Sequence, residues 1–379
     1  MKVSKSNIPK RPFWIAGLIG IVFTSHALAA GYKPPSAEVY FKKQVEGYIP
    51  IQESRGPVPV EVLKIVSGEE TPRGKVASYD RYFKKPNNQS AIVMKDGKII
   101  YETYNSKWKG AKDFPINGQS MTKVITGMTV GALLCSGKIK SLDDTMGEYS
   151  ETLKGSSFSN VTIRRALQMR SGIRKFNDKE GWDLWWMVTA NKKEGYEGKN
   201  FLKKYIKTVK SQNGNGKVSE YHPSNSFALS ILAHDVTGSS LASNFNSEIF
   251  SKINPSANAY WMTDAEGITI PNAGLFMTTL DWAKVGNFVQ SSISEGNCMG
   301  EFFTEGIKSA SKSSTSDNWK YGNHFWTKSG YLIFAGFGGQ AMYVNPKTSV
   351  VVMASSVNPK YGNDFVFNIA ETVVKEAGK

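Results

Sequence analysis

The chain has 379 residues, a formal net charge of +15 and only two cysteines. Its apolar fraction of 40% and its 9 tryptophans exclude an intrinsically disordered chain and fit one large folded catalytic unit. The positive charge comes without a recognised nucleic-acid-binding motif, so we expect no nucleic-acid partner.

Residues 1–29 have the three parts of a secretory signal peptide, and we expect cleavage near Ala29. The parts are a basic start, a short apolar run and a small-x-small site: Lys2, Lys5, Lys10 and Arg11, then 13–24, then Ala27-Leu28-Ala29. The run is too short for an ordinary membrane-spanning helix, and an uncleaved anchor is the alternative. We therefore expect a periplasmic or secreted protein. Its charge fits loose association with an anionic envelope surface or, as we favour, solubility alone.

Two segments precede the first motif. Residues 30–85 are rich in proline and lysine, and we predict an N-terminal arm that packs on a main domain, residues 86–379. Ser90–Met94 and Lys98–Glu102 then flank Asp96-Gly97, and Asp-Gly between apolar runs is a strong signal of a β-hairpin. The first two strands of a sheet are expected here.

Residues 118–123 open a helical run over 124–134 and contain a Ser-x-x-Lys pair. Residues three apart share a face of a helix, so the amine of Lys123 can reach the hydroxyl of Ser120. Serine becomes a nucleophile when a base removes its proton, and lysine is that base only when burial keeps it neutral. The pair fixes only two positions and occurs often by chance, so further motifs decide its interpretation.

Residues from about 138 to 320 have mainly helical patterns. We predict helices over 162–170 and 226–236, and a third that begins at Asp281 as its cap. Trp182, Trp185 and Trp186 lie in this insertion. They fit an apolar acyl pocket, with Trp186 as a substrate-binding residue, and they fit ordinary core packing equally well.

Tyr221 begins the segment Tyr221-His222-Pro223-Ser224-Asn225, which directly precedes a helical pattern. Beside a Ser–Lys pair, a phenol can relay a proton to a leaving group. The alternative is a buried tyrosine with a satisfied hydroxyl. We interpret His222 as a surface or core histidine rather than as a base.

A glycine-rich segment, residues 335–340, enters the last predicted hairpin, formed by 340–344 and 349–353. Clustered glycines let the backbone approach a ligand, and an N–H group here could join that of Ser120 in an oxyanion hole. The alternative is a flexible turn. A final helix is expected over about 364–376.

The order hairpin, helices, hairpin, helix predicts an α+β fold. One antiparallel sheet is expected to combine N-terminal and C-terminal segments. Helices flank this sheet, and a mainly helical subdomain is inserted between its two halves.

Cys135 ends the helix after the serine, and Cys298 follows Gly296 and Asn297 in a predicted loop. An oxidising compartment permits a disulfide, but we expect two separate thiols. The three histidines of the mature chain lack the spacing of zinc ligands, so we expect neither a metal nor another cofactor. They are His222, His234 and His324.

Taken in order, Ser-x-x-Lys, a later Tyr-x-x-x-Asn and a glycine-rich strand entry resemble the serine β-lactamase and penicillin-binding superfamily. The similarity covers about residues 88–375 and is greatest to the class C-like branch, with its esterases and 6-aminohexanoate-dimer hydrolases. Supporting stretches are 167–172, 271–278 and 338–340. The resemblance implies a β-lactamase/transpeptidase-like fold, with Ser120 as the nucleophile, Lys123 as its base and Tyr221 as the second acid/base residue.

Two positions depart from the family pattern. Pro223 stands where the family has an asparagine two places after the tyrosine, so either Asn225 substitutes as a substrate-binding residue or the contact is lost. The usual Lys-Thr-Gly is absent, and the similar Lys328-Ser329-Gly330 lies early. The 6-aminohexanoate-hydrolase pattern instead places Gly336-Phe337-Gly338 there. It implies that the N–H of Phe337 is the second oxyanion donor and that the two glycines contact the substrate.

Together these motifs predict an exported serine hydrolase that cleaves a small-molecule ester or amide, or a peptide, through an acyl-enzyme on Ser120. A D-alanyl-D-alanine carboxypeptidase or β-lactamase is the alternative among enzymes, and the missing Lys-Thr-Gly argues against it. A non-catalytic envelope-binding module is the third interpretation. The sequence leaves the oligomeric state and the physiological substrate open.

Overall fold

A computed structural model describes residues 60–65, 70–86, 88–106, 112–173, 201–211, 216, 218–264, 266–356 and 363–378. The expected signal peptide, most of the expected N-terminal arm and all three tryptophans of the expected acyl pocket lie outside these residues. The domain boundaries expected from the sequence stay predictions.

The main sheet is antiparallel and has eight strands in the order β3-β2-β12-β11-β10-β9-β8-β7. Both predicted hairpins are confirmed, because β2 pairs with β3 and β11 pairs with β12. The pairing of β2 with β12 joins segments from the two ends of the chain, as the α+β prediction requires. The strands are β2 (Asn88–Lys95), β3 (Lys98–Tyr104), β7 (Ser311–Ser313), β8 (Ser316–Tyr321), β9 (Trp326–Lys328), β10 (Tyr331–Gly336), β11 (Gln340–Asn345) and β12 (Val350–Ser356).

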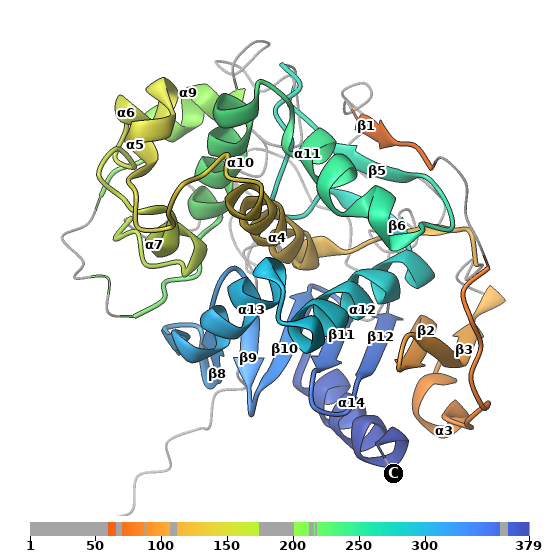
Figure 1. Ribbon diagram of the computed structural model, residues 1–379. Coiled ribbons are helices and arrows are strands. Elements are labelled where there is room, and N and C mark those ends of the chain that lie inside the picture. Colours follow the sequence, from red (N-terminus) through yellow and green to blue (C-terminus); the bar gives the residue numbers. More distant parts are fainter. Residues whose placement is uncertain are drawn as a thin grey trace, which may run out of the picture.

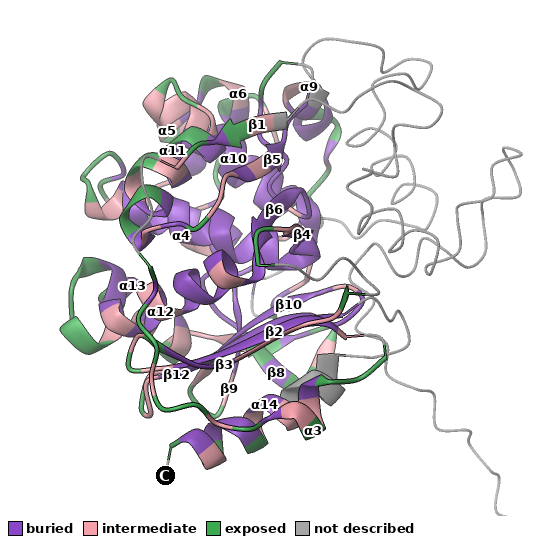
Figure 2. Ribbon diagram, turned by 90° about the vertical axis from the view of Figure 1, so that its right-hand side faces the viewer, coloured by how far each residue is buried: buried purple, intermediate pink, exposed green. Residues whose placement is uncertain are grey.

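Alternating side chains of these strands enter two different cores. On β12, Val351 and Met353 belong to one apolar cluster, whereas Val350 and Val352 belong to the other. Successive side chains of a strand point to opposite faces, so both faces of this sheet are covered. Helix α14 (Asn363–Ala377) covers one face, and α12 (Thr279–Glu295) covers the other, as Figures 1 and 2 show.

Most of the remaining helices gather around α4 (Thr122–Cys135), which is buried along nearly its whole length. A helix that is apolar on all sides belongs in an interior, and α10 (Pro223–Thr237) packs directly against it (Figure 1). None of the helices in the described part of the chain has the length and apolar character to cross a membrane. The other helical elements are α3 (Asp80–Phe83), η3 (Gln119–Met121), α5 (Met146–Tyr149), α6 (Glu151–Lys154), α7 (Ile163–Leu167), α9 (Phe201–Thr208), α11 (Leu241–Glu248), η4 (Phe250–Ile253) and α13 (Cys298–Lys308).

The predicted helices form, with shifted ends. Thr162 caps α7 as expected, and Gly238 ends α10 in the left-handed conformation. The predicted cap at Asp281 is wrong. The cap is Thr278, whose side chain accepts a hydrogen bond from the Asp281 amide, and Asp281 lies in the first turn of α12.

The insertion is less helical than its patterns suggest. It contributes two strands, β5 (Ala259–Met262) and β6 (Leu275–Thr278), to a second sheet with the order β1-β5-β6-β4. The outer strands are β1 (Val60–Leu63) and β4 (Pro115–Asn117). These strands are only three or four residues long, too short for an alternating pattern to stand out.

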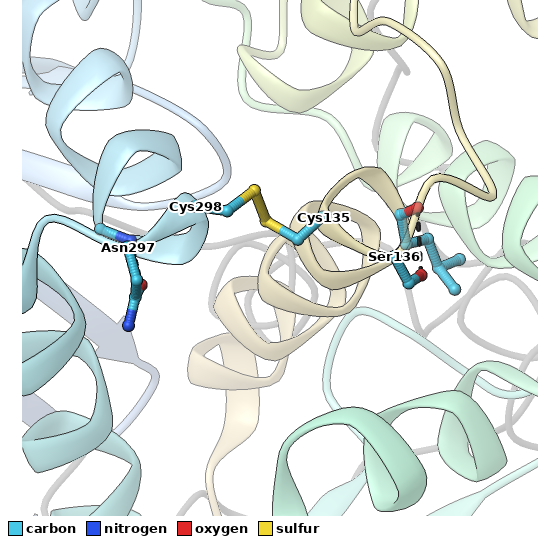
Figure 3. Close-up of a disulfide and its surroundings, with 6 residues drawn as sticks. Cys135, Ser136, Asn297 and Cys298 are labelled. Atoms are coloured by element: carbon cyan, nitrogen blue, oxygen red, sulfur yellow. Dashed lines mark hydrogen bonds between the residues drawn. A yellow bond between two sulfur atoms is a disulfide. The ribbon is translucent and has the colours of Figure 1, made fainter.

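The prediction of two separate thiols is wrong. Cys135 and Cys298 form a disulfide between residues 163 apart in sequence. Figure 3 shows that it joins the end of α4 to the start of α13, while the side chain of Asn297 caps α13. The sequence could not reveal this pairing, because it depends on how two distant helix ends meet in space.

We expect removal of the disulfide to lower the free energy of unfolding by about 2–5 kcal/mol, since the bridge restricts a long loop of the unfolded chain. The test is thermal unfolding of the Cys135→Ala/Cys298→Ala double variant beside the wild type, each with and without a reductant. Cys298 is exposed, so a reductant can reach the bond. The reductant should shift only the wild type, and equal midpoints for all four samples would contradict the prediction.

Candidate active site

Ser120 lies in η3, on a tight turn between β4 and α4. Gln119 has a left-handed φ of 52°, and its amide donates to the Asn117 side chain at 2.7 Å. Gly118 packs on Trp282 so closely that an added Cβ would lie 2.2 Å from the indole. A non-glycine residue with positive φ is held only by well-packed surroundings, so this turn fixes the position of the Ser120 hydroxyl.

Lys123 lies one turn further along and faces Ser120. Its Nζ donates to Ser120 Oγ at 3.1 Å and to the main-chain oxygen of Asn272 at 2.8 Å. The side chain is only 4% exposed, and burial lowers the pKa of the amine from 10.5 to about 7. A substantial fraction of the amine is therefore neutral at neutral pH, and the neutral form can accept the serine proton.

Tyr221 meets the same two residues from the loop before α10. Lys123 Nζ lies 5.1 Å from the centre of the phenol ring. The ring stacks on Trp326 at 5.4 Å and meets the edge of Tyr321 at 5.7 Å. Burial raises the pKa of the phenol well above its usual value, while a side-chain hydrogen bond with Ser120 lowers this pKa by a smaller amount. Tyr221 therefore holds its proton at neutral pH and can donate it.

The backbone of the expected oxyanion segment also reaches this place. Gly336 ends β10 directly against the serine turn, where an added Cβ would lie 2.3 Å from the Gly118 oxygen. Phe337 and Gly338 follow in the turn to β11, and Gly338 has a positive φ of 79°. Strand β10 thus needs a glycine at 336 to pass this close to the turn that carries Ser120.

Lys328-Ser329-Gly330 lies elsewhere. Lys328 ends β9, and Ser329 and Gly330 make the turn into β10. This turn is at the opposite end of β10 from Gly336, so the tripeptide does not take the place of the family's Lys-Thr-Gly.

Asn225 does not reach Lys123. Its side-chain amide donates to the His222 carbonyl at 3.3 Å, inside the first turn of α10. Pro223 starts that helix, and the Nδ1 of His222 accepts from the Ser224 amide as its cap. The second contact of Lys123 comes instead from the Asn272 carbonyl, while His222 is a buried capping residue.

His324 is a neighbour that the sequence interpretation missed. It is fully buried: Nδ1 donates to the Leu167 carbonyl at 2.7 Å, and Nε2 accepts from Ser226 at 3.0 Å. Burial lowers the pKa of the imidazole to about 3, and the nearby Lys123 charge adds to this effect. The ring packs against Gly127, one turn beyond Lys123, and adds no charge to the site. No sequence signal distinguishes it, because its partners come from distant elements.

Among the residues that the structure describes, no three His, Cys, Asp or Glu side chains gather as they would around a metal ion. The site brings together the side chains of Ser120, Lys123 and Tyr221, with backbone N–H groups beside the serine. Such a set suits acyl transfer, because it combines a nucleophile, a neutral base, a proton donor and oxyanion donors.

Residues 85–371 match the protein family described as Beta-lactamase. The chain belongs to this family, and the predicted relationship to β-lactamases and penicillin-binding proteins is confirmed. Its fold is that of the family's serine hydrolases. Curated protein sequences give no match to this chain.

Solved structures repeat the fold at low identity. A protein described as a 6-aminohexanoate-dimer hydrolase from Bacillus anthracis has a TM-score of 0.75 at 18% identity, over 94% of this chain and 97% of that chain. EstCE1, a hydrolase with promiscuous acyltransferase activity, has a TM-score of 0.62 at 12% identity, over 89% of this chain and 99% of that chain. A class C β-lactamase in complex with cefoxitin has a TM-score of 0.57 at 14% identity, over 76% of this chain and 93% of that chain. These likenesses establish the fold and leave the substrate open.

Proposed function

We propose that this protein is an exported serine hydrolase that cleaves an ester or amide through an acyl-enzyme on Ser120. One observation carries the proposal: the Lys123 amine lies 3.1 Å from the Ser120 hydroxyl, in surroundings that lower the pKa of the amine to about 7. A buried lysine of this kind is poised to act as a base at neutral pH.

In the first half of the reaction, Ser120 Oγ attacks the substrate carbonyl while Lys123 takes its proton. The negative oxygen of the tetrahedral intermediate accepts hydrogen bonds from the N–H groups of Ser120 and Phe337. Tyr221 gives its proton to the leaving group as the bond to the carbonyl carbon breaks. The proton on Lys123 then restores the phenol.

In the second half, water attacks the acyl carbon and gives one proton to Lys123, which acts again as the base. The ester bond to Ser120 breaks, the serine regains a proton, and the acid product leaves. Every proton taken is returned, so one water molecule is consumed in each cycle.

Two features support an exported location. Residues 1–29 have the pattern of a signal peptide. The Cys135–Cys298 disulfide suits an oxidising compartment such as the periplasm or the extracellular medium. An exported location suits the D-alanyl-D-alanine carboxypeptidase or β-lactamase alternative equally well. The site argues against that alternative, because Lys328-Ser329-Gly330 lies at the opposite end of β10 from Gly336.

The proposal is tested by intact-mass analysis of the protein after treatment with a fluorophosphonate or with penicillin. We expect one fluorophosphonate adduct, located on Ser120 by peptide mapping, together with turnover of p-nitrophenyl esters. An adduct with penicillin alone would favour the cell-wall or antibiotic alternative. No adduct with any probe would favour a non-catalytic envelope-binding module.

A further inference from the structure

Two arginines lie together beside the tyrosine loop. Arg165 belongs to α7, and Arg170 follows the end of that helix. The Nε of Arg165 donates to the main-chain oxygen of Arg170 at 3.2 Å. The guanidinium of Arg165 also rests on Gly216, where an added Cβ would lie 2.2 Å from Nη2. The Nε of Arg170 donates to the Gly216 carbonyl.

The pair is held in place through neutral groups. Besides Gly216, Arg170 contacts Gln168, since its Nη1 donates to the Gln168 side chain at 3.0 Å. Gln168 is itself buried and donates to Ser309 at 2.8 Å. The left-handed φ of 55° at Met169 bends the chain between Gln168 and Arg170. These contacts hold both guanidinium groups in place and, within the described part of the chain, use one N–H group of Arg165 and two of Arg170.

Neither guanidinium forms an ion pair with a carboxylate among the residues that the structure describes. Arg164, which precedes Arg165 on the same helix, forms ion pairs instead: its guanidinium contacts Asp143 at 2.7 Å and Glu305 at 2.6 Å. Burial lowers the pKa of Arg170, and the Arg165 charge lowers it further. Two close, half-buried positive charges without a counter-ion cost free energy, unless an anion joins them.

The pair is directly connected to the catalytic loop. The Ser219 hydroxyl donates to the Gln168 carbonyl at 2.7 Å, and the Glu220 amide donates to the Met169 carbonyl at 2.8 Å. Tyr221 is the next residue after Glu220, as Arg170 is the next after Met169. The two arginines therefore lie on a segment that is hydrogen-bonded to the loop carrying Tyr221.

We propose that Arg165 and Arg170 form a subsite for a carboxylate carried by the substrate. This inference rests on the proposed function and narrows it to acidic esters or amides. The planar guanidinium groups suit a carboxylate because each can donate two parallel hydrogen bonds to it. Arg165 lies in α7 and Arg170 follows it, so this subsite supplies positive charge from that part of the chain. The strand beside the nucleophile carries no Lys-Thr-Gly whose lysine would supply such a charge.

The test compares mono-4-nitrophenyl glutarate with its methyl ester, which has the same reacting bond but no carboxylate. The wild type should prefer the acid, mainly through a lower KM. Charge-assisted hydrogen bonds predict that Arg165→Gln and Arg170→Gln each raise the KM for the acid by roughly 10-fold to 100-fold. Both variants should leave the methyl ester nearly unaffected, and high salt should weaken the preference. Equal effects on the two substrates would overturn the subsite.

Arg164→Gln is the matched control, because it removes a neighbouring guanidinium that is already paired. It should keep the preference for the acid. Calorimetric titration with glutarate gives a readout without turnover. Binding that both glutamine variants lose supports the subsite even if no ester is cleaved, in which case only the proposed function fails. Glutarate binding that both variants retain, or no binding to the wild type, overturns the subsite.

Discussion

Replacing Ser120 with alanine is expected to lower kcat/KM for p-nitrophenyl esters by at least about 10⁴-fold, the order of loss seen when a catalytic nucleophile is removed. The change deletes one oxygen atom at a position that is 8% exposed. It leaves the turn at Gln119 and its bond to Asn117 intact. The folded structure should therefore persist, with a midpoint of thermal unfolding close to that of the wild type.

Ser136→Ala provides the matched control, since Ser136 lies at the opposite end of the same helix and its hydroxyl donates to the Leu133 carbonyl at 3.3 Å. This variant should keep wild-type turnover. Measurements of ester hydrolysis and of fluorophosphonate labelling on the same samples separate chemistry from folding. A Ser120→Ala protein that still hydrolyses the esters at a rate near that of the wild type would remove the nucleophile from the proposed mechanism.

Replacing Lys123 with methionine should also abolish most activity, by about 10³-fold, which lies within the range for loss of a general base. Methionine keeps an unbranched apolar chain of similar length in the buried channel between Ser120 and Asn272. The wild-type kcat/KM should rise with pH through about 7, where the buried amine loses its proton. Because the pKa of Tyr221 is raised, activity should not fall again until strongly alkaline pH.

The same lysine should affect stability in a defined direction. Its pKa is about 7 when folded and close to 10.5 when exposed in the unfolded chain. Between these values the unfolded state holds the proton and the folded state does not, so the free energy of unfolding rises with pH. Lys123→Met should lack this contribution. Chemical denaturation at several pH values between 7 and 10 checks it, and parallel curves for both proteins would contradict a depressed lysine pKa.

The glycines around the serine show how tightly the site is built. Gly118 meets Trp282, Gly336 meets the Gly118 oxygen, and Gly127 meets His324, each at a distance that leaves no room for a Cβ. The sequence marked the glycine-rich strand entry as a place where backbone approaches a ligand. The structure adds that Gly336 approaches the turn that carries Ser120, which brings β10 against η3.

Several parts of the fold were predictable because their signals are local. Asp96-Gly97 predicted a hairpin, since few other residues suit its turn, and β2 and β3 form it. Thr162 and Gly238 marked helix ends through capping chemistry that involves only their near neighbours. Short strands such as β5 and β6 escaped prediction because a strand of four residues gains its stability from distant partners.

In the candidate site, too, contacts between near neighbours were predictable and contacts between distant residues were not. The Ser120–Lys123 spacing predicted their contact, because helical periodicity alone brings residues three apart together. Pro223 starts α10, and the Asn225 side chain donates to the His222 carbonyl within the first turn of that helix. Whether Asn225 substitutes for the missing family asparagine as a substrate-binding residue stays a prediction. The carbonyl that Lys123 meets belongs to Asn272, 149 residues away in sequence.

The sequence by itself determined the residues of the candidate site and their local arrangement: the serine and lysine one helical turn apart, the tyrosine loop and the glycine-rich strand entry. Only the tertiary structure decided the burial that lowers the pKa of Lys123, the pairing of Cys135 with Cys298, and the placement of Arg165 and Arg170 away from the carboxylates of the described residues. The reason is physical. Helical spacing and turn geometry depend on adjacent residues, whereas pKa values, disulfides and uncompensated charges depend on which distant groups fill the surrounding space.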